Sequence, residues 1–194
     1  MGPTADGDDA LGHGSWFDAP NQLTPKLIEP LREVKVVSVA TCQHEEDTEH
    51  SLAVTEVGRV YSWGGGSAGR LGHGDQEDQG TPKLIEALQE VRVVGVAAGY
   101  CHSLAVTEAG RVYSCGHGAF GRLGHGDEEE QHTPKLIEAL QEVKVVGVAA
   151  GSVHSLASTE AGAVFGWGYG EDECLGLGLT ADQLTPMRHP HLRL

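Results

Sequence analysis

The stretch His102-Ser-Leu-Ala-Val-Thr-Glu-Ala-Gly-Arg-Val-Tyr-Ser-Cys-Gly116 decides the fold, because its first half recurs at a constant step. His50-Ser-Leu-Ala-Val-Thr-Glu precedes it by 52 residues, and His154-Ser-Leu-Ala-Ser-Thr-Glu follows it by 52 residues. Other phrases keep the same step: Leu71-Gly-His-Gly, Leu123-Gly-His-Gly and Leu175-Gly-Leu-Gly. A fixed step of this length indicates one supersecondary unit in tandem, because each unit buries its apolar side chains only against a neighbour.

Each unit divides into four short runs with strand character. In the middle copy these runs are residues 91–98, 102–107, 111–115 and 134–138. They are rich in β-branched residues or alternate in polarity, and both patterns predict strands. Glu108-Ala-Gly110 is predicted to form a tight turn in which the glycine supplies a positive φ. Residues 116–132 are predicted to form a glycine-rich, acidic loop.

Four short antiparallel strands per unit are typical of a β-propeller blade. The first two strands carry small or branched side chains on both sides, as in Gly95, Val96, Ala97, Ala98, Ser103 and Ala105. A sheet with one face in water would instead alternate apolar and polar residues. A blade is covered on both faces by its neighbours, so this pattern favours a propeller. A stacked β-solenoid is the alternative, but its coils are normally much shorter than 52 residues.

The recurring phrases also carry a family resemblance. Four of them follow one another in fixed order and spacing: Val-Val-x-Val-Ala-Ala-Gly, His-Ser-Leu-Ala-Val-Thr-Glu-x-Gly-Arg-Val-Tyr-Ser-Trp-Gly, Gly-x-Leu-Gly-His-Gly-Asp and Thr-Pro-Lys-Leu-Ile-Glu. Together they resemble the repeat of the regulator of chromosome condensation (RCC1-type) family, over nearly all of the chain after about Leu11. That family forms seven-bladed propellers, so the resemblance implies the same kind of blade here.

The number of units is smaller than seven. A leading strand, Thr24-Pro-Lys-Leu-Ile-Glu29, precedes three units, so we expect an all-β partial β-propeller of about three four-stranded blades. The expected divisions are a disordered acidic N-terminus (1–10), the last strand of a preceding blade (11–33) and repeats 1, 2 and 3 (34–90, 91–142 and 143–194). Such an arc is a fragment of a longer protein, is completed to a ring by further copies, or is capped at its ends.

Composition narrows the functional classes. The formal net charge is −15, which disfavours direct binding of nucleic acid, because Lys and Arg are needed to neutralise phosphates. No apolar run approaches the roughly 20 residues of a membrane span, and residues 1–10 show no secretory signal. Cys42, Cys101, Cys115 and Cys174 lie at different phases of the repeat, so we expect thiols in a reducing compartment. These features predict an intracellular protein, cytoplasmic or nuclear.

The histidines do not predict a metal site. His50, His102 and His154 recur at one phase, and His73 and His125 at another. Equivalent side chains in different blades point along different radii, so they do not converge as zinc ligands must. We expect the first set to hydrogen-bond to backbone groups and the second set to fill turns.

Nucleophilic catalysis is not predicted either. The His and Ser of each His-Ser pair are adjacent on a strand and point to opposite faces, which excludes a dyad within the pair. The chain contains no nucleophile elbow, phosphate loop or dinucleotide fingerprint. We therefore expect neither catalysis nor a cofactor.

Tryptophan positions bear on one activity of the family. A plant ultraviolet-B photoreceptor of this family senses light with tryptophans directly before the histidine of the second strand. The matching positions here are Glu49, Tyr100 and Val153, so the resemblance does not imply light sensing. Trp63 and Trp167 are expected to pack between blades.

Acidic residues gather in particular loops. In a four-strand meander the first–second and third–fourth loops emerge on the same side, so all the acidic runs are expected on one face of the arc. The lengthened loop from Cys42 to Glu49 breaks the repeat at an exposed tip, which favours binding there. Arg70 and Arg122 are expected to emerge on this face and to dilute its charge only partly. The candidate protein-binding residues are Glu45, Glu46, Asp47, Glu49, Asp75, Glu77, Asp78, Asp127, Glu128, Glu129, Glu130, Glu171, Asp172 and Glu173.

Three functions are open for this chain. The first is a non-catalytic scaffold module that docks a protein, with a basic partner on the acidic face; acidic loops that only keep the propeller soluble are the simpler explanation. The second is guanine-nucleotide exchange on a Ran-type small GTPase, although no segment here matches the residues that act in the family's exchange factor. The third is the substrate-recognition part of a HECT-type ubiquitin ligase. A homo-oligomer that completes a ring is open as well.

Overall fold

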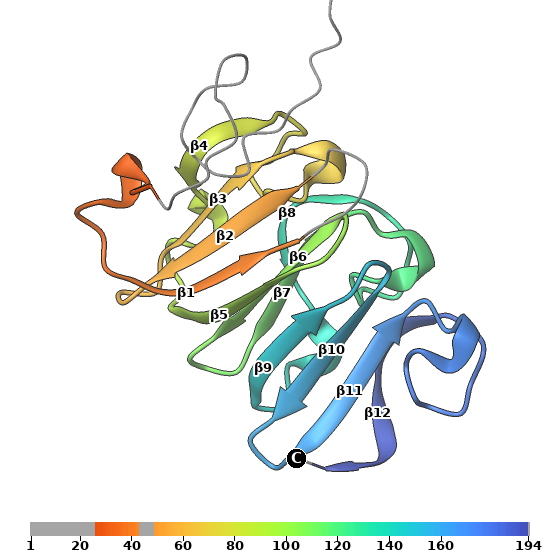
Figure 1. Ribbon diagram of the computed structural model, residues 1–194. Coiled ribbons are helices and arrows are strands. Elements are labelled where there is room, and N and C mark those ends of the chain that lie inside the picture. Colours follow the sequence, from red (N-terminus) through yellow and green to blue (C-terminus); the bar gives the residue numbers. More distant parts are fainter. Residues whose placement is uncertain (1–25, 43–48, 194) are drawn as a thin grey trace, which may run out of the picture.

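One meander of four antiparallel strands is built three times. The computed structural model describes residues 26–42 and 49–193, and Figure 1 shows their three four-stranded sheets. The first sheet contains β1 (Val36–Thr41), β2 (His50–Thr55), β3 (Val60–Gly64) and β4 (Gln79–Leu84). The second contains β5 (Val93–Ala98), β6 (His102–Thr107), β7 (Val112–Gly116) and β8 (Gln131–Leu136). The third contains β9 (Val145–Ala150), β10 (His154–Thr159), β11 (Ala163–Gly168) and β12 (Gln183–Arg193).

Strands that follow one another in the chain are neighbours in every sheet, and all the pairs are antiparallel. The predicted all-β class and the four-stranded propeller blade are thus confirmed. Short 3-10 turns connect the strands: η1 (Glu29–Leu31), η2 (Ser67–Gly69), η3 (Glu86–Leu88), η4 (Ala119–Gly121), η5 (Glu138–Leu140) and η6 (Glu171–Glu173). Among the described residues, no helix has the length and apolarity that crossing a bilayer requires.

The turn between the second and third strands of each sheet depends on glycine. Gly110 has φ +79°, and a Cβ there would lie 2.9 Å from the Cα of Lys144 at the start of the next sheet. Both the backbone conformation and the close approach therefore require glycine. Thr107 Oγ1 accepts a 3.1 Å hydrogen bond from the backbone N–H of Arg111, which closes the turn.

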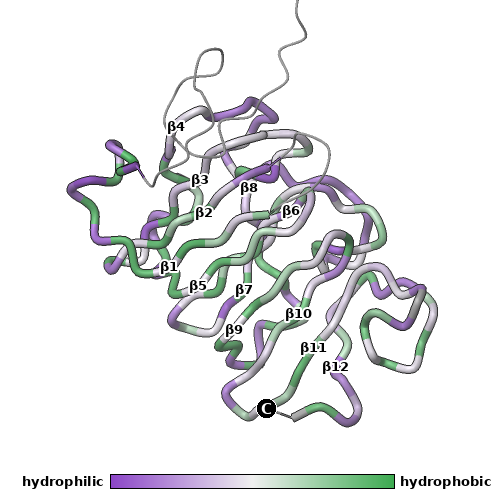
Figure 2. Tube along the Cα trace, viewed as in Figure 1, coloured by the Kyte–Doolittle hydropathy of each residue, from purple (hydrophilic) through white to green (hydrophobic). Residues whose placement is uncertain are grey.

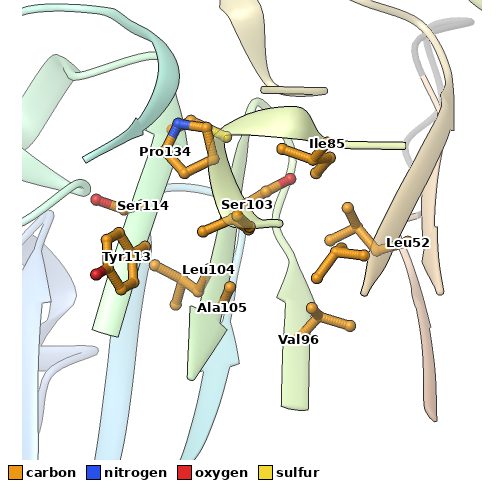
Figure 3. A pocket seen from close by; sticks show the side chains of 12 residues that line it. Leu52, Ile85, Val96, Ser103, Leu104, Ala105, Tyr113, Ser114 and Pro134 are labelled. Atoms are coloured by element: carbon orange, nitrogen blue, oxygen red, sulfur yellow. The ribbon is translucent and has the colours of Figure 1, made fainter. Parts of the chain in front are cut away.

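Apolar side chains join the first sheet to the second. The first sheet and η3 contribute Leu52, Val54, Val60, Ile85 and Leu88, and the second contributes Val93 and Ala105. Figure 3 shows this joint around a cavity of about 10 Å³, with Leu52 and Ile85 on one side and Val96 and Ala105 on the other. The exposed lining of this space is almost entirely apolar, so it offers a water molecule few hydrogen-bond partners.

The second and third sheets repeat this joint. Its core consists of Leu104, Val106, Val112, Ile137 and Leu140, which face Val145, Ala157 and Trp167. Burial of each large aliphatic side chain stabilises the stack by about 2 kcal/mol. Figure 2 shows the hydrophobic stretches along the stacked strands and the hydrophilic ones on the connecting loops.

The leading segment differs from the expected strand. Of Thr24–Glu29, the structure describes the chain from Lys26 onward, and residues 26–28 run without strand pairing into η1. Ile28 has φ −80° and ψ 98°, nearly the values of Ile85 before η3. The segment thus has the geometry of the linker between two blades, but the described residues hold no neighbouring strand with which it could pair.

Candidate protein-binding face

The meander sends its long loops to one end of the stack. The connections β3–β4, β7–β8 and β11–β12 span residues 65–78, 117–130 and 169–182, and Figure 1 shows them on the same side of the three sheets. We call these three loops the loop end. The tight turns at residues 56–59, 108–111 and 160–162 lie at the opposite end, which we call the turn end.

The loop end carries most of the predicted acidic residues. Glu77, Asp78, Glu128, Glu129, Glu130, Glu171 and Glu173 are exposed there, and Asp75 and Asp127 are half-buried. Asp172 lies within η6. Glu49 is half-buried and directly precedes β2, on the same side as these loops. Glu45, Glu46 and Asp47 lie outside the described residues, so their part in this face stays a prediction.

Some of these carboxylates hold the loops in shape. Asp78 Oδ1 accepts a 2.7 Å hydrogen bond from Gly66 N, and Glu128 Oε1 accepts one of 2.7 Å from Phe120 N. Asp75 accepts a hydrogen bond from the backbone N–H two residues further on, and Asp127 does the same, both at 3.1 Å. These contacts are local turn chemistry. They leave other acidic side chains, such as Glu77 and Glu129, exposed on a fixed backbone.

Charge is distributed unequally between the two ends. At the turn end Lys35 pairs with Glu56, Arg92 with Glu108 at 3.1 Å, and Lys144 with Glu160 at 2.9 Å. At the loop end Glu130 lies within ion-pair distance of the imidazoles of His117 and His132, and no such pair with a lysine is recorded among the described residues. The loop end is therefore anionic and the turn end nearly neutral.

The prediction that Arg70 and Arg122 emerge on this face is wrong. Their side chains are buried, with 0% and 4% exposure. Arg70 Nη1 donates a 3.0 Å hydrogen bond to the carbonyl of Tyr100, and Arg122 Nη1 donates one of 3.3 Å to Ser152 O. Each guanidinium thus reaches a carbonyl of the next sheet, and burial lowers the pKa of Arg122. Neither side chain presents its charge on the surface of the loop end.

The histidines of the second strands also join sheets. His50 Nε2 lies 2.8 Å from Ser103 Oγ, and the Ser103 hydroxyl donates a 2.8 Å hydrogen bond to the carbonyl of Arg70. Since that hydroxyl proton is already donated, His50 must donate its Nε2–H to Ser103. His102 makes the same contact with Ser155 at 2.9 Å. The expected structural role is correct, but the partner is a serine of the neighbouring sheet and not a backbone group.

This geometry opposes nucleophilic catalysis by the serines. A general base must accept the hydroxyl proton, whereas here the histidine donates to the serine oxygen. Burial lowers the pKa of both His50 and His102 to about 3, which keeps the rings neutral. A second proton on Nδ1 of either ring would find no acceptor among the described residues. These pairs therefore act as connectors between sheets.

The loop histidines fill turns, as predicted. His73 Nε2 lies 3.0 Å from Ser62 Oγ, and His125 Nε2 lies 2.9 Å from Ser114 Oγ. Burial lowers the pKa of both rings, to about 4 for His125. In the described ranges, no three His, Cys, Asp or Glu side chains lie together as a set that could hold a metal ion.

The two tryptophans of the third strands are buried, and the cysteines are not oxidised to disulfides. Trp167 is fully buried in the core between the second and third sheets, as expected, and Trp63 has 4% exposure. All four cysteines lie within the described residues, and none of them forms a disulfide. Burial raises the pKa of the Cys115 thiol to about 12, so this thiol is unreactive.

Sequence reasoning missed the connecting role of Arg70 and Arg122. A signal was present, because the arginine recurs in the two units that another sheet follows and is Cys174 in the third. The regularity was visible in the repeat, but an arginine in a glycine-rich loop is usually exposed. Its burial depends on the way the next sheet covers the loop, which only the fold shows.

Comparison with known proteins supports the architecture. The model of the regulator of chromosome condensation (RCC1) repeat matches residues 57–106, 109–158 and 161–193. The first two matches run from a turn between the second and third strands to the second strand of the following sheet. Each of these two repeats therefore spans a joint between sheets, where the histidine and arginine contacts lie.

Individual relatives are similar over most of this chain. The ultraviolet-B receptor UVR8 of Arabidopsis thaliana is 42% identical over 182 residues, which are 93% of this chain and 40% of the receptor. The E3 ubiquitin-protein ligase HERC2 of Homo sapiens is 42% identical over 85% of this chain, but the match is 3% of the ligase. The chain thus spans less than half the length of these relatives.

Two solved structures are also similar to this chain over most of its length. Prp20p from Saccharomyces cerevisiae, whose structure was described together with its binding properties to Gsp1p and histones, has a TM-score of 0.69 and 29% identity. That match covers 87% of this chain and 44% of Prp20p. Human WBSCR16 has a TM-score of 0.70 and 26% identity over 82% of this chain and 41% of its own. The repeated blade, its joints and these matches together show that the chain belongs to the regulator of chromosome condensation (RCC1) repeat family.

Proposed function

We propose that the chain is a non-catalytic docking module whose loop end binds a basic segment of a protein partner. The observation that carries this proposal is the charge asymmetry between the two ends. Three glutamates at the turn end are paired with lysine or arginine, whereas Glu77 and Glu129 at the loop end form no ion pair with any described lysine or arginine. Buried Arg70 and Arg122 strengthen the asymmetry, because their guanidinium groups are not on the surface.

Repetition of the face favours docking. Glu77 and Glu129 occupy equivalent positions 52 residues apart, so two neighbouring loops present similar carboxylates to the same side. A basic segment lying across the loops would meet them in succession, and electrostatic complementarity of this kind raises the association rate and selects the partner. The description of Prp20p with histones, which are basic proteins, agrees with a basic partner for this fold.

A charge-matched pair of variants tests the proposal. The loop-end variant carries Glu77→Gln, Glu129→Gln and Glu171→Gln, and the turn-end variant carries the same change at Glu56, Glu108 and Glu160. The probes are a labelled peptide rich in lysine and arginine and a purified histone. We expect the loop-end variant to bind about tenfold more weakly, with a shallower salt dependence. The turn-end variant should bind like the wild type. Equal weakening in both variants would show that only net charge matters.

The lengthened loop has its own test. β1 and β2 are separated by five more residues than β5 and β6, and the extra segment includes Glu45, Glu46 and Asp47. Replacing these three residues and Glu49 by serine should also weaken binding of the basic probe. Unchanged affinity would remove this loop from the proposed face.

The relatives suggest two finer functions for the same module. HERC2 is named as a ubiquitin ligase, so substrate recognition for a HECT-type ligase fits a docking module that covers 3% of such a protein. Prp20p is described with Gsp1p, which keeps guanine-nucleotide exchange on a small GTPase as the second candidate. Release of a labelled nucleotide from a Ran-type GTPase decides between docking alone and exchange, because only an exchange factor accelerates it.

We place this docking in the cytoplasm or the nucleus, consistent with four cysteines that form no disulfide. Fractionation of cells that express the tagged chain tests the location. Recovery from the secreted fraction would contradict it.

A further inference from the structure

The third sheet differs from the other two in the residues that follow its Thr-Pro dipeptide. Thr81, Thr133 and Thr185 are each followed by proline, at the same place in β4, β8 and β12. The next two residues are Lys-Leu in the first two sheets and Met187-Arg188 in the third. The dipeptide is therefore part of the blade, whereas a basic residue three positions after the threonine is specific to the third sheet.

The Thr-Pro dipeptide lies in an irregular part of β12. Gln183 and Met187 pair with two glycines of β11, Gly168 and Gly166. Residues 184–186 therefore stand opposite a single residue of β11, which makes this part of the strand a bulge. The proline costs no ladder hydrogen bond there, because it has no N–H to donate. The threonine is thus in an extended segment but outside the regular ladder.

The groups that an enzyme would recognise are on the surface. Thr185 is exposed, and its hydroxyl makes no hydrogen bond with any residue that the structure describes. Arg188 is exposed as well and forms no ion pair within the described ranges. The first strands of the three sheets lie beside one another, whereas the fourth strands are apart at the outer rim (Figure 1). An enzyme can therefore approach β12 from the rim of the stack.

We propose that Thr185 is a phosphorylation site for a protein kinase that requires proline directly after the threonine and prefers arginine or lysine three residues after it. Such a kinase binds its substrate as an extended segment, which the backbone of β12 already is. Because the bulge interrupts the ladder, local opening of residues 183–188 is sufficient and the sheet need not unfold. Opening also releases the 2.9 Å hydrogen bond from the N–H of Gly126 to the carbonyl of Leu184.

The transfer itself needs ATP and the kinase. Thr185 Oγ1 forms a bond to the γ-phosphorus of ATP, and the bond from that phosphorus to the oxygen that bridges it to the β-phosphate breaks. ADP leaves, and the hydroxyl proton passes to a base of the kinase.

Phosphorylation at this position adds charge to the loop end. A Cβ on Gly126, in the loop of residues 117–130, would lie 3.6 Å from Thr185 Cγ2. Asp127 and Glu128 follow this glycine directly. A phosphothreonine carries a charge of about −1.5 to −2 at pH 7, so the anionic face becomes larger. This consequence rests on the proposed docking function, and it makes phosphorylation strengthen the binding of a basic segment.

Phosphorylation of the folded chain tests the site. The full chain and a peptide of residues 180–193 are incubated with a purified cyclin-dependent kinase and ATP, and the modified residues are located by mass spectrometry. We expect Thr185 to be modified about tenfold faster than Thr81 or Thr133, which lack the arginine. Arg188→Leu, which restores the leucine of the other two sheets, should lower the rate at Thr185 to theirs.

Three results would overturn the proposal. Modification of the peptide but not of the folded chain would show that β12 is inaccessible. Equal rates at all three threonines would show that the kinase does not read Arg188. Absence of modification in both the peptide and the chain would show that Thr185 is not a substrate.

The effect on docking is measured separately. The phosphorylated and the unmodified chain are titrated with the labelled peptide rich in lysine and arginine. We expect about threefold tighter binding after phosphorylation, and no change when Thr185→Val is treated with the same kinase. Absence of binding by both forms would contradict the docking proposal alone, whereas equal binding by both forms would refute the effect of the phosphate on docking.

Discussion

Replacement of His102 by alanine should destabilise the chain by about 3 kcal/mol. The ring is fully buried, and Nε2 lies 2.9 Å from Ser155 Oγ of the next sheet. Loss of this hydrogen bond between sheets costs about 1 kcal/mol. The space that the ring leaves adds about 2 kcal/mol, because the surrounding sheets cannot collapse fully into it.

His154 provides a matched control for this prediction. It occupies the same position in the third sheet, is half-buried, and has no following sheet against it among the described residues. His154→Ala should therefore cost less than about 1 kcal/mol. The difference between the two substitutions isolates the contact between sheets from the local effect of removing a histidine at the start of a strand.

Urea unfolding followed by circular dichroism measures both costs. A double-mutant cycle of His102→Ala with Ser155→Ala should give a coupling of about 1 kcal/mol, because the two side chains share one buried hydrogen bond. Equal costs at His102 and His154, together with no coupling to Ser155, would refute the reasoning. The sheets would then be joined by apolar packing alone.

Three further predictions follow from the same contacts. His50 and His102 have a folded-state pKa of about 3, below the ordinary 6.5, so below pH 6.5 the unfolded chain binds protons that the folded chain does not. The free energy of unfolding should therefore be unaffected by these histidines above pH 6.5 and should fall by about 1.4 kcal/mol per pH unit for each histidine as the pH is lowered from 6.5 towards 3. Urea unfolding at several pH values should show this loss, and His102→Ala should reduce it. Gly121→Ala should destabilise the chain by more than about 2 kcal/mol, since its Cβ would lie 2.5 Å from the Cα of Leu184 in the next sheet. Glu173→Gly should stabilise the chain by about 0.5–1 kcal/mol, because glycine adopts the positive φ of this position without strain. Thermal unfolding temperatures that shift in the same direction for both variants would contradict this account. Arg122→Met should cost about 2–4 kcal/mol, because two carbonyls lose a charged donor, and a change below about 0.5 kcal/mol in urea unfolding would mean that the guanidinium is not a connector.

The repeat was sufficient to predict the blade, but it did not predict the side-chain contacts between sheets. The constant step and the pattern of small and branched residues were sufficient for four strands per unit, because these properties depend on local sequence. The partner of His50 could not be found in the same way. Adjacent residues do point to opposite faces, so the pair His50-Ser51 is excluded, but Ser103 lies 53 residues further on and meets His50 only when the sheets stack.

The side on which the acidic loops lie was predicted from the sequence, but the predicted exposure of Arg70 and Arg122 was wrong. Placement of the acidic loops on one side follows from the meander, which fixes the end from which each loop leaves. The exposure of Arg70 and Arg122 was misjudged because a charged residue in a loop is normally in water. Here the next sheet covers the loop and supplies a carbonyl to each guanidinium, so neither arginine is a surface cation on this face.

Hydrogen–deuterium exchange of the full chain, with and without the basic peptide, tests the docking of a basic partner most directly. The proposal predicts that the peptide slows exchange in residues 65–78, 117–130 and 169–182, and leaves the turns at residues 56–59, 108–111 and 160–162 unchanged. Protection confined to those turns, or protection spread equally over both ends of the stack, would contradict it.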